Sequence, residues 1–520
     1  MKRRPFLRYT TTTALAAYGL GHQTHLLANS PPLVLRAYLP NGAPLPEFEL
    51  NRLYFLDLDN EPIPHPDRTV EDGILTSQPP PVPFAIVLQL PVEGFGDVTL
   101  YADNRGRGFT PSDFPLVLNG AFARDRIHRV SVACDRWQRQ GYKMPQRVRD
   151  RLGRAQAYLT QASQAPNLQT QIPLWNNALA ESLWAGEAAA LSRAGQRIAR
   201  TPTRQGFKLG CNAFGHPGLG ADYDRHFEAL FTTATVPFYW KPFEPERGQP
   251  NYTEVDAQVA WLQQSGIAPK GHPLTWFHEI SVPDWVRPLP YEAVKAALHQ
   301  RIVEITQRYG SQIPAYDVIN EAHDVPWANE LGYDQGQFLD LTRMACEAAR
   351  EGNPHVQRVV NSCCLWARNV AIYGPPQRSP LQYLKACLAA DIDFEIIGLQ
   401  LYYPDQDMFE IDRMLDHFTA LGKPIHITEM SCSSNTGIDE NSQLGDAQGL
   451  WHAPWSEAIQ ADWVEQIYTL AYSKPQIEAV TWWDFSDQAT FWPFGGLLNR
   501  NNQPKAAYYR LPGLKQVWGI

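Results

Sequence analysis

Residues 315–322, Ala-Tyr-Asp-Val-Ile-Asn-Glu-Ala, form an apolar, strand-like run that ends in an amide and a carboxylate. An amphipathic segment at residues 335–350 follows, with apolar residues at helical spacing. The same order of strand and helix occurs eight times from residue 205 to the C-terminus. The predicted strands are residues 208–214, 232–239, 268–276, 315–322, 358–364, 394–403, 424–430 and 479–485.

Strands separated by helices imply parallel pairing, and a stretch of about 250 residues or more suits a closed (β/α)8 TIM barrel. A doubly wound open sheet is the alternative. No glycine-rich phosphate-binding motif follows any of the predicted strands, which disfavours the nucleotide-binding forms of that sheet. The sequence therefore predicts an α/β barrel domain at residues 205–520.

The part of the chain before the barrel has two different patterns. Residues 30–140 contain short strand-like runs separated by Pro and Gly clusters, which predict a small β-sandwich. This would be an accessory domain, with either a carbohydrate-binding or a purely structural role. Residues 141–204 have helical composition, and Pro166 and Pro173 divide them into two expected helices. We expect a helical hairpin that links the sandwich to the barrel.

Residues 1–29 resemble a twin-arginine export signal, because the pair Arg3-Arg4 is followed by Phe6-Leu7 and a mildly apolar stretch. We therefore expect export to the periplasm or the cell exterior, with an untargeted basic tail as the alternative. The apolar run is too short and too polar to span a bilayer, and no later segment is a candidate for a membrane span.

Composition narrows the classes of ligand. The net charge is −9 and there is no long run of Lys or Arg, so we expect no nucleic-acid partner. The 16 Trp and 22 Tyr offer flat apolar faces that can lie against the C–H faces of sugars. The seven cysteines have neither zinc-site nor disulfide-framework spacing, and we expect no metal and no cofactor.

Two acids stand where a barrel places its chemistry, at the C-terminal ends of strands. Glu321 ends the fourth predicted strand, and Glu429 ends the seventh. A single acid at a strand end is usually structural. Strands four and seven, however, lie on opposite sides of the barrel mouth, so these two carboxyls can face each other. Retaining glycoside hydrolysis needs two carboxyls about 5–5.5 Å apart, one as nucleophile and one as acid/base. Asn320 can donate a hydrogen bond to a sugar hydroxyl.

The barrel, from about residue 207 to residue 511, resembles glycoside hydrolase family 10, the endo-β-1,4-xylanases. Residues 316–322 are similar to the acid/base motif W-D-V-V-N-E-A, and residues 427–429 to the nucleophile motif I-T-E. Further motifs match in the same order, at residues 244–249, 271–276, 361, 398–400, 481–483 and 497–508. The resemblance implies that Glu321 is the acid/base and Glu429 the nucleophile of a hydrolase that cleaves xylan or a related polysaccharide by double displacement.

The resemblance also implies a set of substrate-binding residues at the strand ends. They are His272, Trp276, Asn320, Asn361, Gln400, Tyr402, Trp483 and Trp492.

The chain departs from the family pattern in three places, one of which is Phe277, where the family has a His after the strand-three Trp. Thr235, Val236 and Tyr239 replace the Glu, Asn and Lys that bind the sugar one unit beyond the cleaved residue, which predicts altered specificity. Tyr402 replaces a His that bonds the nucleophile. A phenol can donate one hydrogen bond to Glu429 but carries no positive charge there, and a simply packed ring is the alternative.

Two further interpretations stay open. The same fold and mechanism can serve a different β-glycan, or the barrel can be a sugar-binding protein that has lost activity. Retention of Glu321, Glu429 and Asn320 argues against the binding protein, because a protein that only binds sugar has no need of two apposed carboxylates.

Overall fold

The structure is a computed structural model that describes residues 31–64, 67–323, 325–367, 370–371, 378–402, 405–447 and 449–520. The proposed export signal, residues 1–29, lies outside the described residues, as does Tyr403 at the end of the sixth predicted strand. Among the described helices, none has the length and apolar character needed to cross a lipid bilayer.

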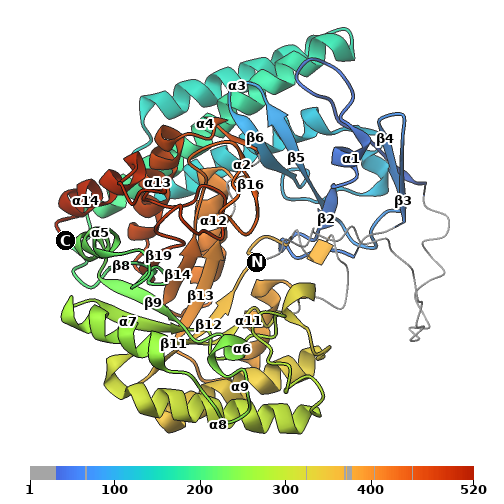
Figure 1. The fold of residues 1–520 in the computed structure, drawn as a ribbon. Helices are drawn as coiled ribbons and strands as arrows, with labels where there is room; N and C mark the ends of the chain where they lie inside the picture. The colour runs from blue at the N-terminus through green and yellow to red at the C-terminus, as the bar shows by residue number, and fades with distance from the viewer. Residues whose placement is uncertain are drawn as a thin grey trace.

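Eight parallel strands close into a barrel in the order β10-β11-β12-β13-β14-β19-β8-β9 (Figure 1). The predicted closed barrel is confirmed. Several strands, such as β13, are buried at every position, which explains why they appear in the sequence as largely apolar runs with few polar positions. The strands are β8 Lys208–Asn212, β9 Thr233–Pro237, β10 Ala268–His272, β11 Ala315–Asn320, β12 Gln357–Ser362, β13 Ile396–Leu401, β14 Ile425–Met430 and β19 Ile477–Trp482.

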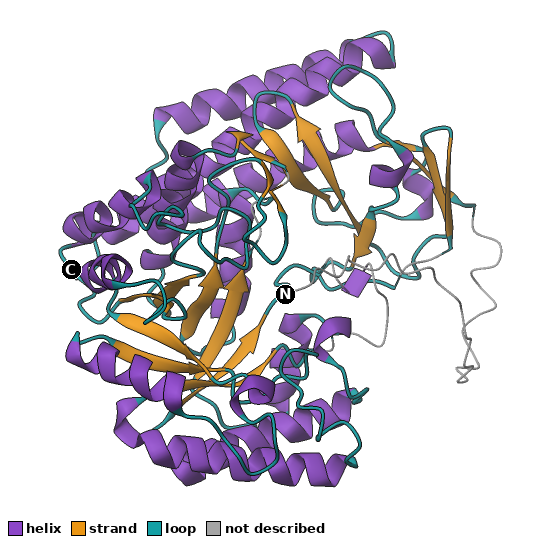
Figure 2. Ribbon diagram, in the orientation of Figure 1, coloured by secondary structure: helices purple, strands orange, loops and turns teal. Residues whose placement is uncertain are grey.

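Helices surround the barrel strands (Figure 2). Local sequence sets where several of them begin: the side chains of Asp334 and Ser379 form capping boxes that satisfy the first backbone N–H groups of α9 and α11. The helices of this domain are α5 Ala221–Leu230, α6 Trp240–Phe243, α7 Thr253–Gln264, α8 Tyr291–Tyr309, α9 Gln335–Gly352, α11 Pro380–Ala389, α12 Met408–Thr419, α13 Glu457–Tyr472 and α14 Ala506–Trp518.

The predicted β-rich N-terminal region is present as two sheets. One has the order β3-β4-β1-β7, and the other contains β2, β5 and β6. Phe55, Leu75 and Leu88 belong to one core between the sheets and the helices that follow them. The elements are β1 Leu33–Arg36, α1 Glu47–Leu50, β2 Tyr54–Leu56, β3 Arg68–Glu71, β4 Ile74–Ser77, β5 Ala85–Val92, β6 Gly96–Ala102 and β7 Leu116–Val117.

A loop of the barrel completes the second N-terminal sheet. Residues after β14 form β17 (Leu450–Trp451) and β18 (Ala453–Pro454), and β17 pairs antiparallel with β6 through Trp451 and Gly96. A Cβ on Gly96 would lie 2.9 Å from both the backbone N of His452 and the backbone O of Leu450, so only glycine allows this close approach.

Residues 141–204 contain two helices, as expected, α3 Gln146–Gln164 and α4 Leu168–Ile198, and a third helix, α2 Leu118–Arg139, precedes them. Helix α2 begins inside the region predicted to contain only strands. Its buried face includes Asp125 and Arg126, and these charged residues interrupt the helical spacing of apolar residues in the sequence. Pro166 separates α3 from α4, but Pro173 lies inside α4. There the helix loses one backbone hydrogen bond and continues, because its apolar face is packed in the core. The domain boundaries at residues 140 and 204 stay predictions.

Buried charges join the linking helices to the barrel. The guanidinium of Arg126 on α2 lies 2.6 Å from Asp407 and 3.2 Å from Glu410 of α12, and Arg129 lies 3.0 Å from Glu410. Removing one partner from such a set would leave a buried charge without compensation, which is costly. These ion pairs therefore fix α2 against α12.

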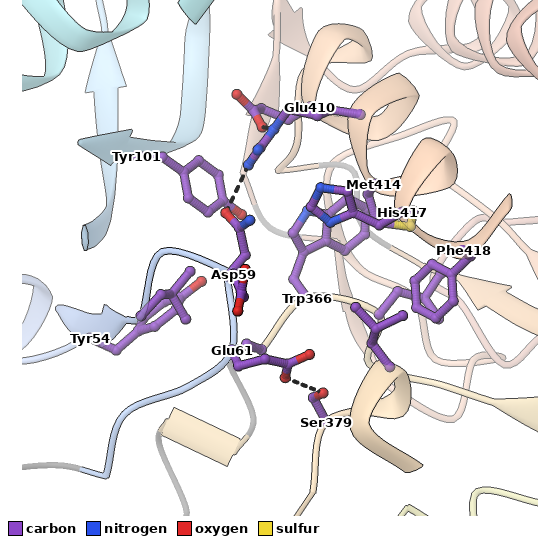
Figure 3. Close-up of a pocket in the computed structure, with 16 residues that line it drawn as sticks. Tyr54, Asp59, Glu61, Tyr101, Trp366, Ser379, Glu410, Met414, His417 and Phe418 are labelled. Atoms are coloured by element: carbon purple, nitrogen blue, oxygen red, sulfur yellow. Dashed lines mark hydrogen bonds and ion pairs between the residues drawn. The ribbon is translucent and has the colours of Figure 1, made fainter. Parts of the chain in front are cut away.

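A small cavity lies in the same interface (Figure 3). Tyr54 and Tyr101 line it from the N-terminal region, and Met414 and Phe418 line it from α12. At its edge the hydroxyl of Ser379 donates to a carboxylate oxygen of Glu61 at 2.5 Å. Neither Glu321 nor Glu429 lines this cavity.

Candidate active site

Glu321 and Glu429 both stand at the carboxyl ends of barrel strands. Glu321 directly follows β11, and Glu429 is the fifth residue of β14. Both are almost fully buried, with 6% and 7% of their surface exposed. The φ of Glu321 is +56°, a conformation that non-glycine residues rarely adopt and that occurs preferentially at functional sites.

Three side-chain N–H donors hold the carboxylate of Glu321. The indole Nε1 of Trp276 donates to its Oε2 at 3.0 Å, and that of Trp327 donates to the same oxygen at 3.2 Å. The amide Nε2 of Gln400 donates to Oε1 at 3.0 Å. The carboxyl is therefore held in one orientation at the barrel mouth.

A chain of amides connects the two acids. Gln400 donates to Oδ1 of Asn320 at 3.1 Å as well as to Glu321. The Nδ2 of Asn361 donates to Asn320 Oδ1 at 2.8 Å and to Glu429 Oε1 at 3.2 Å. Both donors reach Oδ1 of Asn320, so its NH2 group points away from them. Thr428 donates to Asn361 Oδ1 at 2.6 Å and fixes the orientation of that amide.

The other side of Glu429 contacts two rings. The hydroxyl of Tyr402 donates to Oε2 of Glu429 at 3.0 Å. The Nε2 of His272 lies 3.8 Å from Oε1. Tyr402 therefore supplies a neutral donor at the position where the family pattern has a His.

His272 belongs to a buried polar group beneath the site. Its Nδ1 lies 2.8 Å from Oδ2 of Asp317, and Lys270 donates to the same oxygen at 2.5 Å. Burial lowers the pKa of His272, although the hydrogen bond to Asp317 opposes this. Asp317 is also fully buried, but Lys270 and His272 hold its pKa below the ordinary value. His272 is thus a neutral imidazole beside the ion pair of Lys270 and Asp317.

The two catalytic candidates have raised pKa values. Burial raises the pKa of Glu321, and the side chains of Gln400, Trp276, Trp327 and Asn320 reduce the effect. Burial also raises the pKa of Glu429, and the nearby charge of Glu321 raises it further. Two buried carboxyls that repel each other's charge retain a proton more readily than isolated ones. The arrangement favours one protonated and one ionised carboxyl, as a general acid beside a nucleophile requires.

Aromatic rings line the mouth beside these acids. Trp483 contacts His272 edge-on, with ring centroids 5.3 Å apart, and Trp492 stacks on Tyr402 at 5.8 Å. Tyr239 lies 5.6 Å from His272 and 5.9 Å from Trp276. The site thus combines polar groups at the bond-cleaving centre with aromatic walls.

All the site residues predicted from the sequence lie in this region, but the sequence missed two contributors. Trp327 lies in a short 3-10 turn, Pro326–Ala328, after β11, where no strand-end rule points to it. Its only sequence signal is an indole six positions after Glu321. Asp317 is part of the quoted motif, but the motif alone gives it no role of its own. The signal that could have found it is the alternation of side chains along β11, which places Asp317 on the same face of the strand as Ile319.

A second cluster lies near the site. The ligand atoms of His323, Cys363 and Cys364 lie within 4.8 Å of one another, the two Sγ atoms 3.2 Å apart. Sequence spacing did not reveal it, because His323 follows β11 while the cysteines follow β12. Among the described residues the cluster has three ligand atoms, fewer than the four of structural zinc sites. The expectation of no metal stays a prediction.

The comparison with protein families decides the assignment. The model of glycosyl hydrolase family 10 matches residues 219–512, more than half of the chain. The chain belongs to glycosyl hydrolase family 10. The match covers every barrel strand from β9 to β19 and both Glu321 and Glu429.

Curated relatives in this family are distant in sequence. An endo-1,4-β-xylanase/feruloyl esterase of Xylanibacter ruminicola is 24% identical over 304 residues, which is 53% of this chain and 39% of that protein. Endo-1,4-β-xylanase 3 of Arabidopsis thaliana is 24% identical over 283 residues, 54% of this chain and 34% of that protein. The chain thus spans well under half the length of these relatives.

Solved structures of similar chains include native xylanase 10B from Thermotoga maritima. The TM-score is 0.49 at 19% identity, over 63% of this chain and 98% of that one. For xylanase 10B from Thermotoga petrophila in complex with xylobiose, the TM-score is 0.48 at 20% identity, over 63% of this chain and 96% of that one.

Proposed function

We propose that this family 10 protein is an endo-β-1,4-xylanase-type hydrolase that cleaves xylan or a related β-1,4-glycan with retention of configuration. The observation that carries the proposal is the pair Glu321 and Glu429, two buried carboxyls at the ends of β11 and β14 that one chain of amides connects. The names of the xylanase relatives support the substrate class.

In the first step, Glu429 attacks the anomeric carbon of the sugar while Glu321 gives its proton to the leaving glycosidic oxygen. This produces a covalent glycosyl-enzyme and a shortened chain. In the second step, Glu321 takes a proton from water as that water attacks the same carbon and releases Glu429. Two inversions at one carbon give net retention.

The surrounding groups have roles in these steps. The N–H donors from Asn361 and the O–H of Tyr402 stabilise the ionised nucleophile before attack and as it leaves. Asn320, whose Oδ1 is occupied by two donors, has its NH2 group oriented for a sugar hydroxyl, a contact that strengthens in the transition state. The rings of Trp483 and Trp492 provide apolar faces for the sugar.

The test is hydrolysis of xylan, mixed-linkage glucan and an aryl xylobioside by the wild type and by Glu429→Ala, with proton NMR of the first-formed anomer. We expect turnover of xylan and the aryl xylobioside with retention, and loss of both in the variant. The matched control is Glu71→Ala, an exposed glutamate of β3, which should match the wild type. Xylan activity that survives Glu429→Ala would overturn the site, and an inverted first product would overturn the mechanism.

A different β-glycan is the second candidate, because Thr235, Val236 and Tyr239 replace the polar residues of the family pattern beside the cleaved sugar. Preference for mixed-linkage glucan over xylan in the same assay would favour it. Failure to turn over any β-glycan, together with oligosaccharide binding, would identify a sugar-binding protein instead.

We also propose that residues 1–29 act as a twin-arginine export signal, on the basis of Arg3-Arg4 and Phe6-Leu7. Replacing both arginines by lysine should keep the protein in the cytoplasm of a bacterial host, as measured by cell fractionation. Unchanged export of that variant would contradict the proposal.

A further inference from the structure

An open groove runs between the N-terminal region and the barrel mouth. Its volume is about 590 Å³, within the usual range of ligand sites. One wall belongs to the N-terminal region and includes Arg52, Gln89 on β5 and Asp97 on β6. The opposite wall includes Tyr402, Trp492 and Trp455 of the barrel domain. The groove therefore lies between two parts of the chain that are far apart in sequence.

The groove and the candidate active site share Tyr402 and Trp492. Tyr402, which lines the groove, donates its hydroxyl proton to Glu429 at 3.0 Å. Trp492 stacks on the same tyrosine, with ring planes 10° apart. A chain that is bound at Glu429 and extends past these two rings would therefore enter the groove.

The two walls are fixed to each other. The backbone N–H of Thr99 on β6 donates to the carbonyl of Asp405 at 3.0 Å, and its hydroxyl donates to the Asp405 carboxylate at 3.2 Å. On the other side, β17 pairs with β6 through Trp451 and Gly96. The groove is thus formed before any ligand arrives, which lowers the entropic cost of binding.

The side chains in the groove fit a neutral, hydroxyl-rich ligand. The side-chain amide of Gln89 has no hydrogen-bond partner among the described residues. Amides can both donate to and accept from hydroxyls, and the partly exposed indole of Trp492 offers an apolar face. Glu49, Asp97, Asp405 and Asp446 line the groove against a single arginine, which disfavours phosphate or another anion.

We propose that the N-terminal region forms one wall of an extended substrate cleft, in which the Arg52, Gln89 and Asp97 side chains bind further sugar units of a β-linked glycan that is cleaved at Glu429. This inference rests on the proposed function and extends it. It assigns the N-terminal region a direct part in substrate binding, as one side of the cleft itself.

The test compares a long and a short substrate. The ratio of kcat/KM for xylohexaose to kcat/KM for an aryl xylobioside is measured for the wild type, for the double variant Arg52→Ala/Gln89→Ala and for Gln89→Trp, whose ring fills the groove. Loss of one or two polar contacts should lower this ratio about 5- to 30-fold, because each net hydrogen bond contributes about 1 kcal/mol, a factor of about five. Gln89→Trp should lower it as well. The matched control is Gln78→Ala, an exposed glutamine that does not line the groove, and its ratio should equal that of the wild type.

The outcomes separate this inference from the proposed function. If the wild type cleaves the aryl xylobioside but the ratio is unchanged in both groove variants, the groove inference is overturned and the proposed function stands. An equal loss on both substrates would also overturn it. If the wild type cleaves neither, the proposed function fails, and calorimetric binding of xylohexaose then decides: binding weakened by the double variant supports the groove, and absent or unaltered binding overturns it.

Discussion

The end of β9 and the ends of β11, β13 and β14 surround the same barrel mouth but differ in chemistry. At the latter three, amides, indoles and a phenol hold both acids in place by hydrogen bonds. At β9, Thr235 and Val236 are buried, and Tyr239 contacts the rings of Phe214, His272 and Trp276. The proposed bond-cleaving centre is thus built from hydrogen-bonding groups, whereas the end of β9 beside it consists of buried side chains and an aromatic ring. The proposed chemistry and the proposed sugar recognition therefore rest on different residues of one mouth and can be tested separately.

The strongest test of this contrast is Glu429→Gln, which keeps the shape of the side chain but removes the nucleophile. We expect kcat on xylan to fall by about 10⁴-fold or more. Circular dichroism should show an unchanged fold. An activity within tenfold of wild type would mean that the polar centre is not where the bond is cleaved.

Asn361→Ala interrupts the chain of amides between the two acids. It removes a donor from Glu429 and from Asn320 at once. Removing one preorganised donor at a reacting centre typically costs about 10²-fold in kcat. Steady-state kinetics should show the loss in kcat rather than in KM. A change confined to KM would indicate that Asn361 only helps to bind the ground state.

Tyr402→Phe tests the neutral donor beneath Glu429. Loss of a hydrogen bond to a charged group should lower kcat about tenfold. Since the O–H of Tyr402 stabilises the carboxylate, its removal raises the pKa of Glu429, which is already raised by burial and by Glu321. The nucleophile must be ionised, so the acid limb of the pH–kcat/KM profile should move to higher pH. An unmoved acid limb would show that the phenol is only packed there.

The smallest effect is expected at the β9 end. Tyr239→Phe keeps the ring contacts with His272 and Trp276, so kcat/KM on xylan should change by less than about threefold, as for a substitution that removes no buried partner. A tenfold loss would show that the Tyr239 hydroxyl binds the sugar, and the contrast between the two ends of the mouth would then weaken.

The sequence predicts the barrel well because its strands are buried on both faces. Residues 315–320 are buried throughout and mostly apolar apart from Asp317 and Asn320, so the strand is recognisable and Glu321 stands at its end. The same reasoning fails where burial is mixed. Helix α2 buries Asp125 and Arg126 together with its apolar residues. Strand β17 has only two residues, which are too few to show an alternation of apolar and polar side chains. Trp327 is positioned by a turn, and the partners of a turn residue depend on tertiary contacts.

The participation of β17 in the N-terminal sheet has a consequence for how such a protein can be rearranged by gene recombination. A domain attached by a free tether can be exchanged without damage to its neighbour. Here, exchange of the N-terminal region would leave β17 without β6 and would remove Arg126 from Asp407, a buried carboxylate whose only ion pair among the described residues is with that arginine. We therefore expect exchange of the N-terminal region alone to destabilise the barrel, and a substitution on one side of their interface to require a matching one on the other.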